Sequence, residues 1–244
     1  MGKVFAVGVG PGSQNYITEI VRKTIVGADI IVGHKYTLDI ISSLIQDKKV
    51  HIITMEDQEK TYQQIKKELG GRVLVVPFTG DVNFSESEVV DRLIEVFGDV
   101  EIIPGISSVQ VAASKAKIPL DKSKVITMHV TTSIEEKKIE LQKAVLDGFN
   151  VILIPRPWPK DPKRHFMPSE VAAYLKKNGF NTSNIPVNVF ESLTNGREQT
   201  FAGSMQELEG KEFSDLSVMV ISQTKPESYI NFRLQNVYEY FIRV

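Results

Sequence analysis

The sequence of 244 residues contains no cysteine and only four histidines. The protein therefore has no disulfide bond, no thiolate ligand for a metal and no thiol nucleophile, and a histidine-rich metal site is disfavoured. No apolar run approaches the roughly 20 residues that cross a bilayer, and the N-terminus shows no signal-like segment. Excess charge is also lacking, because 29 basic and 30 acidic residues leave a net charge of −1. We therefore expect a cytoplasmic enzyme without a membrane or nucleic-acid partner.

The hydrophobic content of the whole chain, 42%, is typical of a globular protein. The first half of the chain shows a regular alternation of two kinds of segment. Short apolar, β-branched segments alternate there with segments of helical spacing. The strands are predicted at 4–8, 28–32, 50–53, 73–76 and 100–103, and the helices at 17–26, 36–45, 60–69, 88–97 and 107–115. This alternation predicts a parallel, doubly wound sheet.

The second half follows a different pattern, because several strands succeed one another with little helix between them. We predict strands at 125–128, 151–154, 187–190, 200–203 and 217–221, and helices at 134–146 and 169–177. The fold class is therefore α/β with two domains, an N-terminal parallel sheet (1–115) and a C-terminal mixed sheet (125–221), joined by a linker at 116–124. A ligand cleft is expected between the domains. An extension at 222–244 carries apolar residues that favour docking on its own subunit or on a second copy.

A glycine-rich turn, residues 8–12, follows the first strand. A dinucleotide-binding turn would have a third glycine where Ser13 stands and an acidic residue after the second strand, where the chain has His34 and Lys35. The G-K-[ST] signature of a Walker loop is also absent. The pattern therefore argues against a phosphate cradle and leaves a tight turn that needs glycine conformations.

Two more loops of small residues follow predicted strands. The sequence TGDVNFS occupies 79–85, and PGISS occupies 104–108. Because loops after parallel strands meet at the carboxyl edge of a sheet, we expect all three loops to lie together and to let backbone approach a ligand closely.

In this order and spacing, "VGVGPG", "ADIIVGHKY", "GDVNFSE", "IIPGISSVQVAASK", "VITMH" and "FSDLSVMVI" resemble the tetrapyrrole methylases. The resemblance covers about residues 3–221 and is strongest to the subgroup that methylates precorrins at C5. In one respect the chain departs from the family, which usually has proline after the Gly-Asp pair, whereas this chain has Val82 and Asn83.

The resemblance implies a methyltransferase that uses S-adenosyl-L-methionine (SAM), folded between the two domains, to methylate a precorrin-type tetrapyrrole in cobalamin biosynthesis, at C5 of cobalt-precorrin-7. It also implies a homodimer. SAM has no phosphate, which agrees with the absence of phosphate-binding motifs. The residues that the resemblance places near SAM are Val9, Gly80, Asp81, Phe84, Ser107, Ser108, Val130 and Ile154, and Gly10 and Pro11 are placed near the macrocycle.

A precorrin carries several carboxylates, and two basic stretches are candidates to bind them. His34 and Lys35 follow the second strand, and the segment 155–168 contains Arg156 and Arg164 among five basic residues, with Trp158 and four prolines besides the closing Pro168. Arginine suits bidentate contacts with carboxylates, so this segment is predicted to be a basic lid, with a solvated surface loop as the alternative.

Methyl transfer from a sulfonium depends mainly on in-line positioning, which agrees with a site rich in glycine and serine. The sequence identifies no general base. Two alternatives stay open. One is a methyltransferase similar to diphthine synthase that acts on a protein side chain, and the other is a nucleotide-binding module without catalytic activity.

Overall fold

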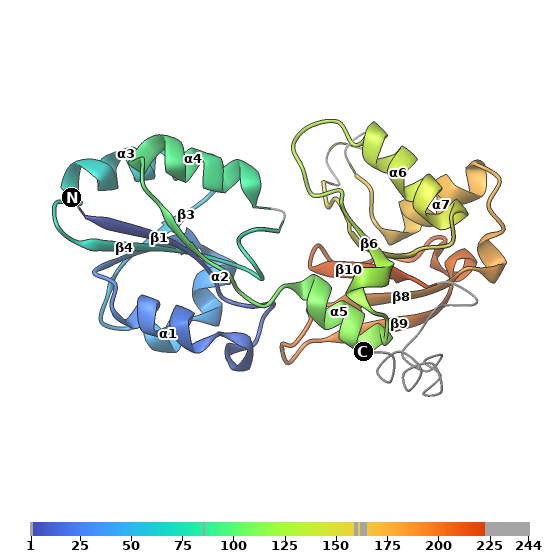
Figure 1. Cartoon of the computed structure of the whole chain (residues 1–244), viewed down its shortest axis with the longest axis horizontal. Coiled ribbons are helices and arrows are strands. Elements are labelled where there is room, and N and C mark those ends of the chain that lie inside the picture. The colour runs from blue at the N-terminus through green and yellow to red at the C-terminus, as the bar shows by residue number, and fades with distance from the viewer. Residues whose placement is uncertain (1, 85, 159–160, 162–164, 223–244) are drawn as a thin grey trace, which may run out of the picture. The chain divides into compact units, whose positions relative to one another are not determined.

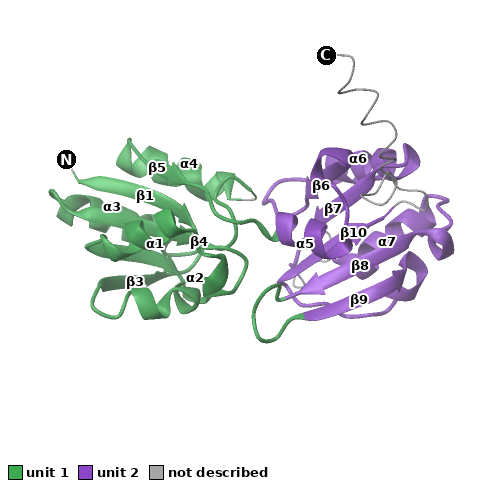
Figure 2. Cartoon of the chain, turned by 60° about the horizontal axis from the view of Figure 1, so that its bottom comes forward, with its two compact units in different colours: residues 1–108, 192–198 green, residues 109–191, 199–244 purple. Residues whose placement is uncertain are grey.

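A computed structural model describes residues 2–84, 86–158, 161 and 165–222. The predicted extension at 222–244 and Arg164 therefore lie outside the described residues, apart from Ser222. The chain forms two compact units, shown in different colours in Figure 2. The first comprises residues 1–108 together with 192–198, and the second comprises 109–191 and the chain from 199 onwards.

The first unit contains a five-stranded sheet in the order β3-β2-β4-β1-β5, in which every neighbouring pair is parallel. Its elements are β1 (Lys3–Gly8), α1 (Glu19–Val26), β2 (Ile30–His34), α2 (Lys35–Ile40), β3 (Lys49–Ile53), α3 (Gln58–Glu68), β4 (Val73–Phe78), α4 (Ser87–Phe97) and β5 (Glu101–Ile103), with short 3₁₀ turns at Gln14–Tyr16 and Ser42–Leu44. The predicted parallel sheet is confirmed.

Helices cover both faces of this sheet (Figure 1). Along β4 the buried side chains alternate, so that Leu74 and Val76 pack under α3 and α4 while Val75 packs with α1 and α2. This double burial explains why the strand is apolar at every position rather than at every second one. The expected helix 36–45 is shorter than predicted, because the chain leaves α2 after Ile40 and continues as a 3₁₀ turn.

The second unit contains a mixed sheet in the order β6-β7-β10-β8-β9. Only β6 and β7 run parallel, whereas β10 is antiparallel to both β7 and β8, and β8 is antiparallel to β9. The elements are α5 (Ser108–Ala116), β6 (Ser123–Thr127), α6 (Glu135–Leu146), β7 (Asn150–Ile154), α7 (Pro168–Lys177), β8 (Pro186–Glu191), β9 (Gln199–Ser204) and β10 (Ser217–Ile221), with 3₁₀ turns at Leu120–Lys122, Thr182–Asn184 and Met205–Leu208. One core unites this sheet with α6 and α7.

The structure divides the chain at different residues from those predicted. From Val109 onwards α5 belongs to the second unit, and the expected linker at 116–124 is part of that unit, with Ile118 buried and β6 beginning at Ser123. Residues 192–198 belong to the first unit, although they follow β8 in the chain. No helix among the described residues is long and apolar enough to cross a membrane.

Candidate active site

The strand order creates a switch point at the centre of the first sheet. From β1 the chain passes through α1 to β2, and from the neighbouring β4 it passes through α4 to β5. These two connections run in opposite directions and lie on opposite faces of the sheet (Figure 1). In open α/β sheets, ligands bind beyond the carboxyl ends of such strands. The glycine-rich turn and the loop 79–86 both start there.

Two glycines join these loops through an isolated antiparallel bridge. The Gly10 N–H donates to the Gly80 carbonyl over 3.2 Å, and the Gly80 N–H donates to the Gly10 carbonyl over 2.8 Å. Both residues have a positive φ, 82° for Gly10 and 74° for Gly80, and residues other than glycine rarely adopt such angles. Backbone pairing between β1 and β4 therefore continues past the ends of the strands.

Glycines at positions 8 and 105 let the loop after β5 join the same group. A Cβ atom on Gly8 would lie 2.6 Å from the Gly105 nitrogen, and one on Gly105 would lie 2.5 Å from the Gly8 oxygen. The sequence led us to expect that such glycines make room for a ligand. At these two positions the protein's own backbone occupies the space instead.

Gly80 is different, because a Cβ atom there would make only ordinary van der Waals contacts with the backbone around it. A Cβ atom there would have no neighbour closer than the Ser108 nitrogen at 3.8 Å and the Ser107 Cα atom at 3.9 Å. Ser108 is the first residue of α5, and Ser107 is 8% exposed. The structure thus brings three of the predicted SAM residues together at the start of a helix, where backbone N–H groups favour an anionic group.

Asp81 ties two of the loops together. Its Oδ2 accepts a hydrogen bond from the Gly105 N–H over 2.7 Å, and its Oδ1 accepts one from the Asn83 N–H over 2.9 Å. The Phe84 N–H donates to the Asp81 carbonyl and closes the turn. Val82, where the family usually has proline, is buried in the core beneath α3 and α4. Asp81 therefore shapes the site through the backbone it holds.

The other predicted residues of the glycine-rich turn offer mainly backbone. The Val9 side chain is fully buried in the core with α1 and α2, and its N–H donates to the Phe78 carbonyl over 2.8 Å. Pro11 is also buried. Any contact of Val9 with a ligand therefore comes from main-chain atoms.

The basic pair after β2 lies beside acidic groups. Lys35 forms an exposed ion pair with Asp39 at 3.2 Å. The hydrogen bond from the Thr54 N–H keeps the pKa of the Asp57 carboxyl below its usual range, and His34 adds a smaller electrostatic contribution in the same direction. A hydrogen bond of 2.9 Å between the hydroxyls of Thr37 and Thr79 holds α2 beside the end of β4. The pair thus lies at the carboxyl edge of the sheet, as expected from its place after β2.

Glu86 is an unusual carboxyl group in the loop that precedes α4. Burial raises its pKa from 4.5 to about 7. Burial also raises the pKa of Tyr62, a fully buried tyrosine of α3 whose electrostatic neighbours include Glu86. Among the described residues the Tyr62 hydroxyl has no hydrogen-bond partner. The sequence did not single out either residue, because a glutamate before a helix is ordinarily a solvated cap.

In the second unit, the parallel strands β6 and β7 also end near predicted residues. The Met128 N–H donates to the Ile154 carbonyl over 2.8 Å, and the Val130 N–H donates to the Met128 carbonyl over 2.9 Å. Ile154 is the last residue of β7, Val130 follows the neighbouring β6, and both are half-buried.

Arg156 does not have the exposed position that a lid residue requires. It is 2% exposed, and its guanidinium donates to the carbonyls of Thr131 and Thr132 over 3.2 and 2.9 Å. The same guanidinium lies 4.6 Å from the centre of the Trp158 ring, whose edge-on neighbour is His129. Arg156 therefore anchors the loop after β6 through these carbonyls, and its predicted contact with a substrate carboxylate stays a prediction.

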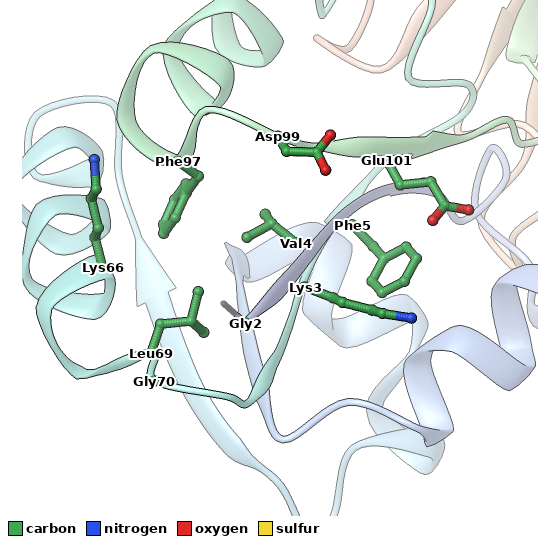
Figure 3. Close-up of a pocket in the computed structure, with 10 residues that line it drawn as sticks. All are labelled: Gly2, Lys3, Val4, Phe5, Lys66, Leu69, Gly70, Phe97, Asp99 and Glu101. Carbon is green, nitrogen blue, oxygen red and sulfur yellow. The ribbon is translucent and has the colours of Figure 1, made fainter.

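A cavity of about 360 Å³ opens at the opposite, amino-terminal edge of the first sheet (Figure 3). It is lined by the start of β1, the end of α3 and the segment between α4 and β5, with Lys3, Lys66, Asp99 and Glu101 at its sides. None of the predicted site residues lies in its wall. Within the residues that the structure describes, no group of three or more His, Asp and Glu side chains is placed to hold a metal ion.

Comparison with known proteins decides the family. The family model for tetrapyrrole (corrin/porphyrin) methylases matches residues 3–209. The chain belongs to the tetrapyrrole methylase family. A protein of Methanocaldococcus jannaschii, named a probable cobalt-precorrin-7 C(5)-methyltransferase, is 30% identical over 221 residues, which are 89% of this chain and 96% of that protein.

Two solved structures share the fold of this tetrapyrrole methylase. The methyltransferase CobJ has a TM-score of 0.72 and 19% identity, with 92% of this chain and 95% of that chain covered. The cobalamin biosynthesis precorrin-6Y methylase of Archaeoglobus fulgidus has a TM-score of 0.65 and 21% identity, with 92% and 100% covered. At these identities the similarity concerns the fold alone.

The residues at the switch point fit SAM, the methyl donor that the family implies. Gly80 packs against the backbone of Ser107 and Ser108 where α5 begins, and the N-terminus of a helix favours an anionic group such as the carboxylate of SAM. The order of the three loops predicted their convergence. Nothing in the sequence predicted that residues 192–198 would join them in the first unit.

Proposed function

We propose that this tetrapyrrole methylase is a SAM-dependent C-methyltransferase of cobalamin biosynthesis that methylates C5 of cobalt-precorrin-7. The observation that carries the proposal is the similarity to the M. jannaschii protein, because it extends over 96% of that protein's length. A match of this extent includes both units and both sets of predicted ligand-binding loops.

The geometry supports methyl transfer rather than phosphate chemistry. When bound, SAM supplies a methyl group on a sulfonium centre whose leaving group is neutral, so the protein mainly has to hold the donor and the carbon nucleophile in line. The group made by Gly8, Gly10, Gly80 and Gly105 suits this task. Gly10 and Gly80 pair through their backbones, Gly8 and Gly105 pack closely, and the Gly105 N–H donates to the Asp81 carboxylate.

Within the site, we assign the methionine part of SAM to Gly80, Asp81, Phe84, Ser107 and Ser108. Asp81 would act by holding the Gly105 and Asn83 backbone in place. Val130 and Ile154 remain the proposed contacts of adenosine, and Gly10 and Pro11 those of the macrocycle. Because Arg156 is occupied by carbonyl groups, we propose His34 and Lys35 as contacts of the substrate carboxylates, and Arg164 stays a prediction outside the described residues.

The test is methyl transfer from isotopically labelled SAM to a panel of precorrins, with and without cobalt, followed by NMR of the product. We expect one labelled methyl group on C5. Label on another ring carbon would reject the C5 assignment, and label only on a protein side chain would favour the activity of a diphthine synthase.

A matched pair of glycine variants tests the SAM site. Gly80→Ala places a Cβ atom in van der Waals contact with the Ser107 and Ser108 backbone, among the proposed contacts of the methionine part, whereas Gly98→Ala places one where no atom lies within 4 Å. Both glycines have a positive φ, 74° and 84°, so an alanine is strained at either position, and the thermal stability of each variant is measured beside its SAM affinity. We expect only Gly80→Ala to weaken SAM binding in calorimetry. Equal affinities for the two variants would contradict the proposed position of SAM.

A further inference from the structure

Residues 192–198 form a segment, here called the docking loop, that stands between β8 and β9 in the chain but belongs to the first unit (Figure 2). Within that unit it contacts the glycine-rich turn. The Ser13 N–H donates to the Thr194 Oγ1 over 3.0 Å. A Cβ atom on Gly12 would lie 2.7 Å from the Leu193 oxygen, so the turn and the docking loop pack backbone against backbone.

The docking loop holds an unfavourable backbone conformation. Ser192 has a φ of 49° and Thr194 a φ of 67°, and a positive φ in a β-branched residue is an outlier. Glycine would adopt these angles without strain, as it does at Gly10 and Gly80. Residues kept in such conformations cluster at functional sites. A threonine at position 194, where glycine would be unstrained, therefore suggests that its side chain has a function.

Hydrogen bonds inside the docking loop fix the orientation of Thr194. Its N–H donates to the Glu198 carboxylate over 2.7 Å, and the Glu198 N–H donates to the Asn195 carbonyl over 3.2 Å. The Asn195 N–H in turn donates to the Ser192 carbonyl over 3.2 Å, and Leu193 is buried. The hydroxyl is therefore presented to Ser13 by a rigid loop.

We propose that Thr194 is a positioning residue for the methyl transfer. Its hydroxyl fixes the far end of the glycine-rich turn at Ser13, while the bridge between Gly10 and Gly80 fixes the near end. Pro11 and Gly12 lie between the two anchors. Because the proposed function places this turn against the macrocycle, the inference rests on that function and concerns the tetrapyrrole rather than SAM.

Three variants separate the hydroxyl from the backbone strain. Thr194→Val keeps the shape and the strain but removes the acceptor, Thr194→Ser keeps the acceptor, and Thr194→Gly removes both the acceptor and the strain. Thr200→Val is the control, since Thr200 is an exposed threonine of β9. We expect Thr194→Val and Thr194→Gly to lower kcat/KM for the tetrapyrrole roughly five- to tenfold, the effect of one hydrogen bond.

Thr194→Ser should restore kcat/KM to within about twofold. The Kd for SAM should change less than about twofold in all variants, because the proposed contacts of its methionine part lie in other loops and Val9 is held by β4 through its own N–H. A purely structural role makes a different prediction, since Thr194→Gly would then be as active as the wild type or more so. Wild-type kcat/KM in folded Thr194→Val would overturn the inference.

Hydrogen exchange of the Ser13 amide gives a readout that does not depend on activity. We expect slow exchange in the wild type and in Thr194→Ser, and faster exchange in Thr194→Val. Unchanged exchange in Thr194→Val would overturn the positioning role. If the exchange rates follow the expected pattern but the wild-type protein methylates no tetrapyrrole, the proposed function is rejected and the contact between Ser13 and Thr194 still stands.

Discussion

Replacing Asp81 tests whether the candidate site is held together through backbone rather than through contacts with the ligand. Asp81→Ala removes both acceptors and leaves the N–H groups of Gly105 and Asn83 without them. Asp81→Asn keeps one carbonyl oxygen, which can turn towards Gly105. The two variants therefore differ chiefly in the bond that joins the loop after β4 to the loop after β5.

The expected size of the effect follows from exposure. Asn83 is exposed, so water can replace the bond to its N–H, whereas the bond to Gly105 is partly buried. A hydrogen bond to a charged group is worth about 1.5–3 kcal/mol, so Asp81→Ala should lose about 2 kcal/mol of unfolding free energy. For a chain of this size that lowers Tm by roughly 4–8 °C. Asp81→Asn should lose less than half as much.

Thermal unfolding and calorimetric titration with SAM check this reasoning together. We expect SAM affinity to fall about tenfold in Asp81→Ala, since about 1.4 kcal/mol of loop ordering is transferred to the binding step, and to recover in Asp81→Asn. Asp99→Ala, at the opposite end of β5, is the control. If Asp81→Asn binds SAM as weakly as Asp81→Ala while both keep the wild-type Tm, the carboxylate contacts the ligand directly and the reasoning is refuted.

Three further substitutions have defined outcomes. Gly105→Ala should cost about 1–3 kcal/mol in urea unfolding, because its Cβ would lie 2.5 Å from the Gly8 oxygen; a wild-type midpoint would contradict this packing. The raised pKa of Glu86 means that the folded protein keeps a proton that the unfolded chain has released, so stability should fall as the pH rises from 4.5 to about 7. Glu86→Gln should remove this contribution, at most about 3 kcal/mol, and an unchanged pH profile would argue against the raised pKa. Tyr62→Phe should be neutral or stabilising by up to about 1 kcal/mol, and a clear loss would reveal a partner for the hydroxyl.

The sequence was sufficient to predict the sheets because their strands leave a strong pattern. The apolar run of β4 has no polar alternation, and the structure buries it on both faces. The ordered loops after β1, β4 and β5 likewise predicted a common edge, because the carboxyl ends of parallel strands must meet there.

Side-chain partners were less predictable, since they depend on segments distant in the sequence. Five basic residues among prolines indicated an exposed lid, but Arg156 is buried by carbonyls from residues 131 and 132. Burial of an arginine cannot be read from its neighbours in the chain. The residues Ser13 and Thr194 are 181 positions apart in the sequence, and neither belongs to a motif that would predict their contact.

The divided make-up of the first unit affects the order in which it can be completed during synthesis. Residues 1–108 contain the whole parallel sheet, but the partner of the Ser13 N–H is Thr194. At usual rates of translation these segments emerge roughly 5–15 s apart. During that interval the glycine-rich turn of the nascent sheet lacks its contact with the docking loop. A fragment that ends at residue 108 lacks this contact at all times. A fragment that holds the whole first unit therefore has to combine residues 1–108 with residues 192–198.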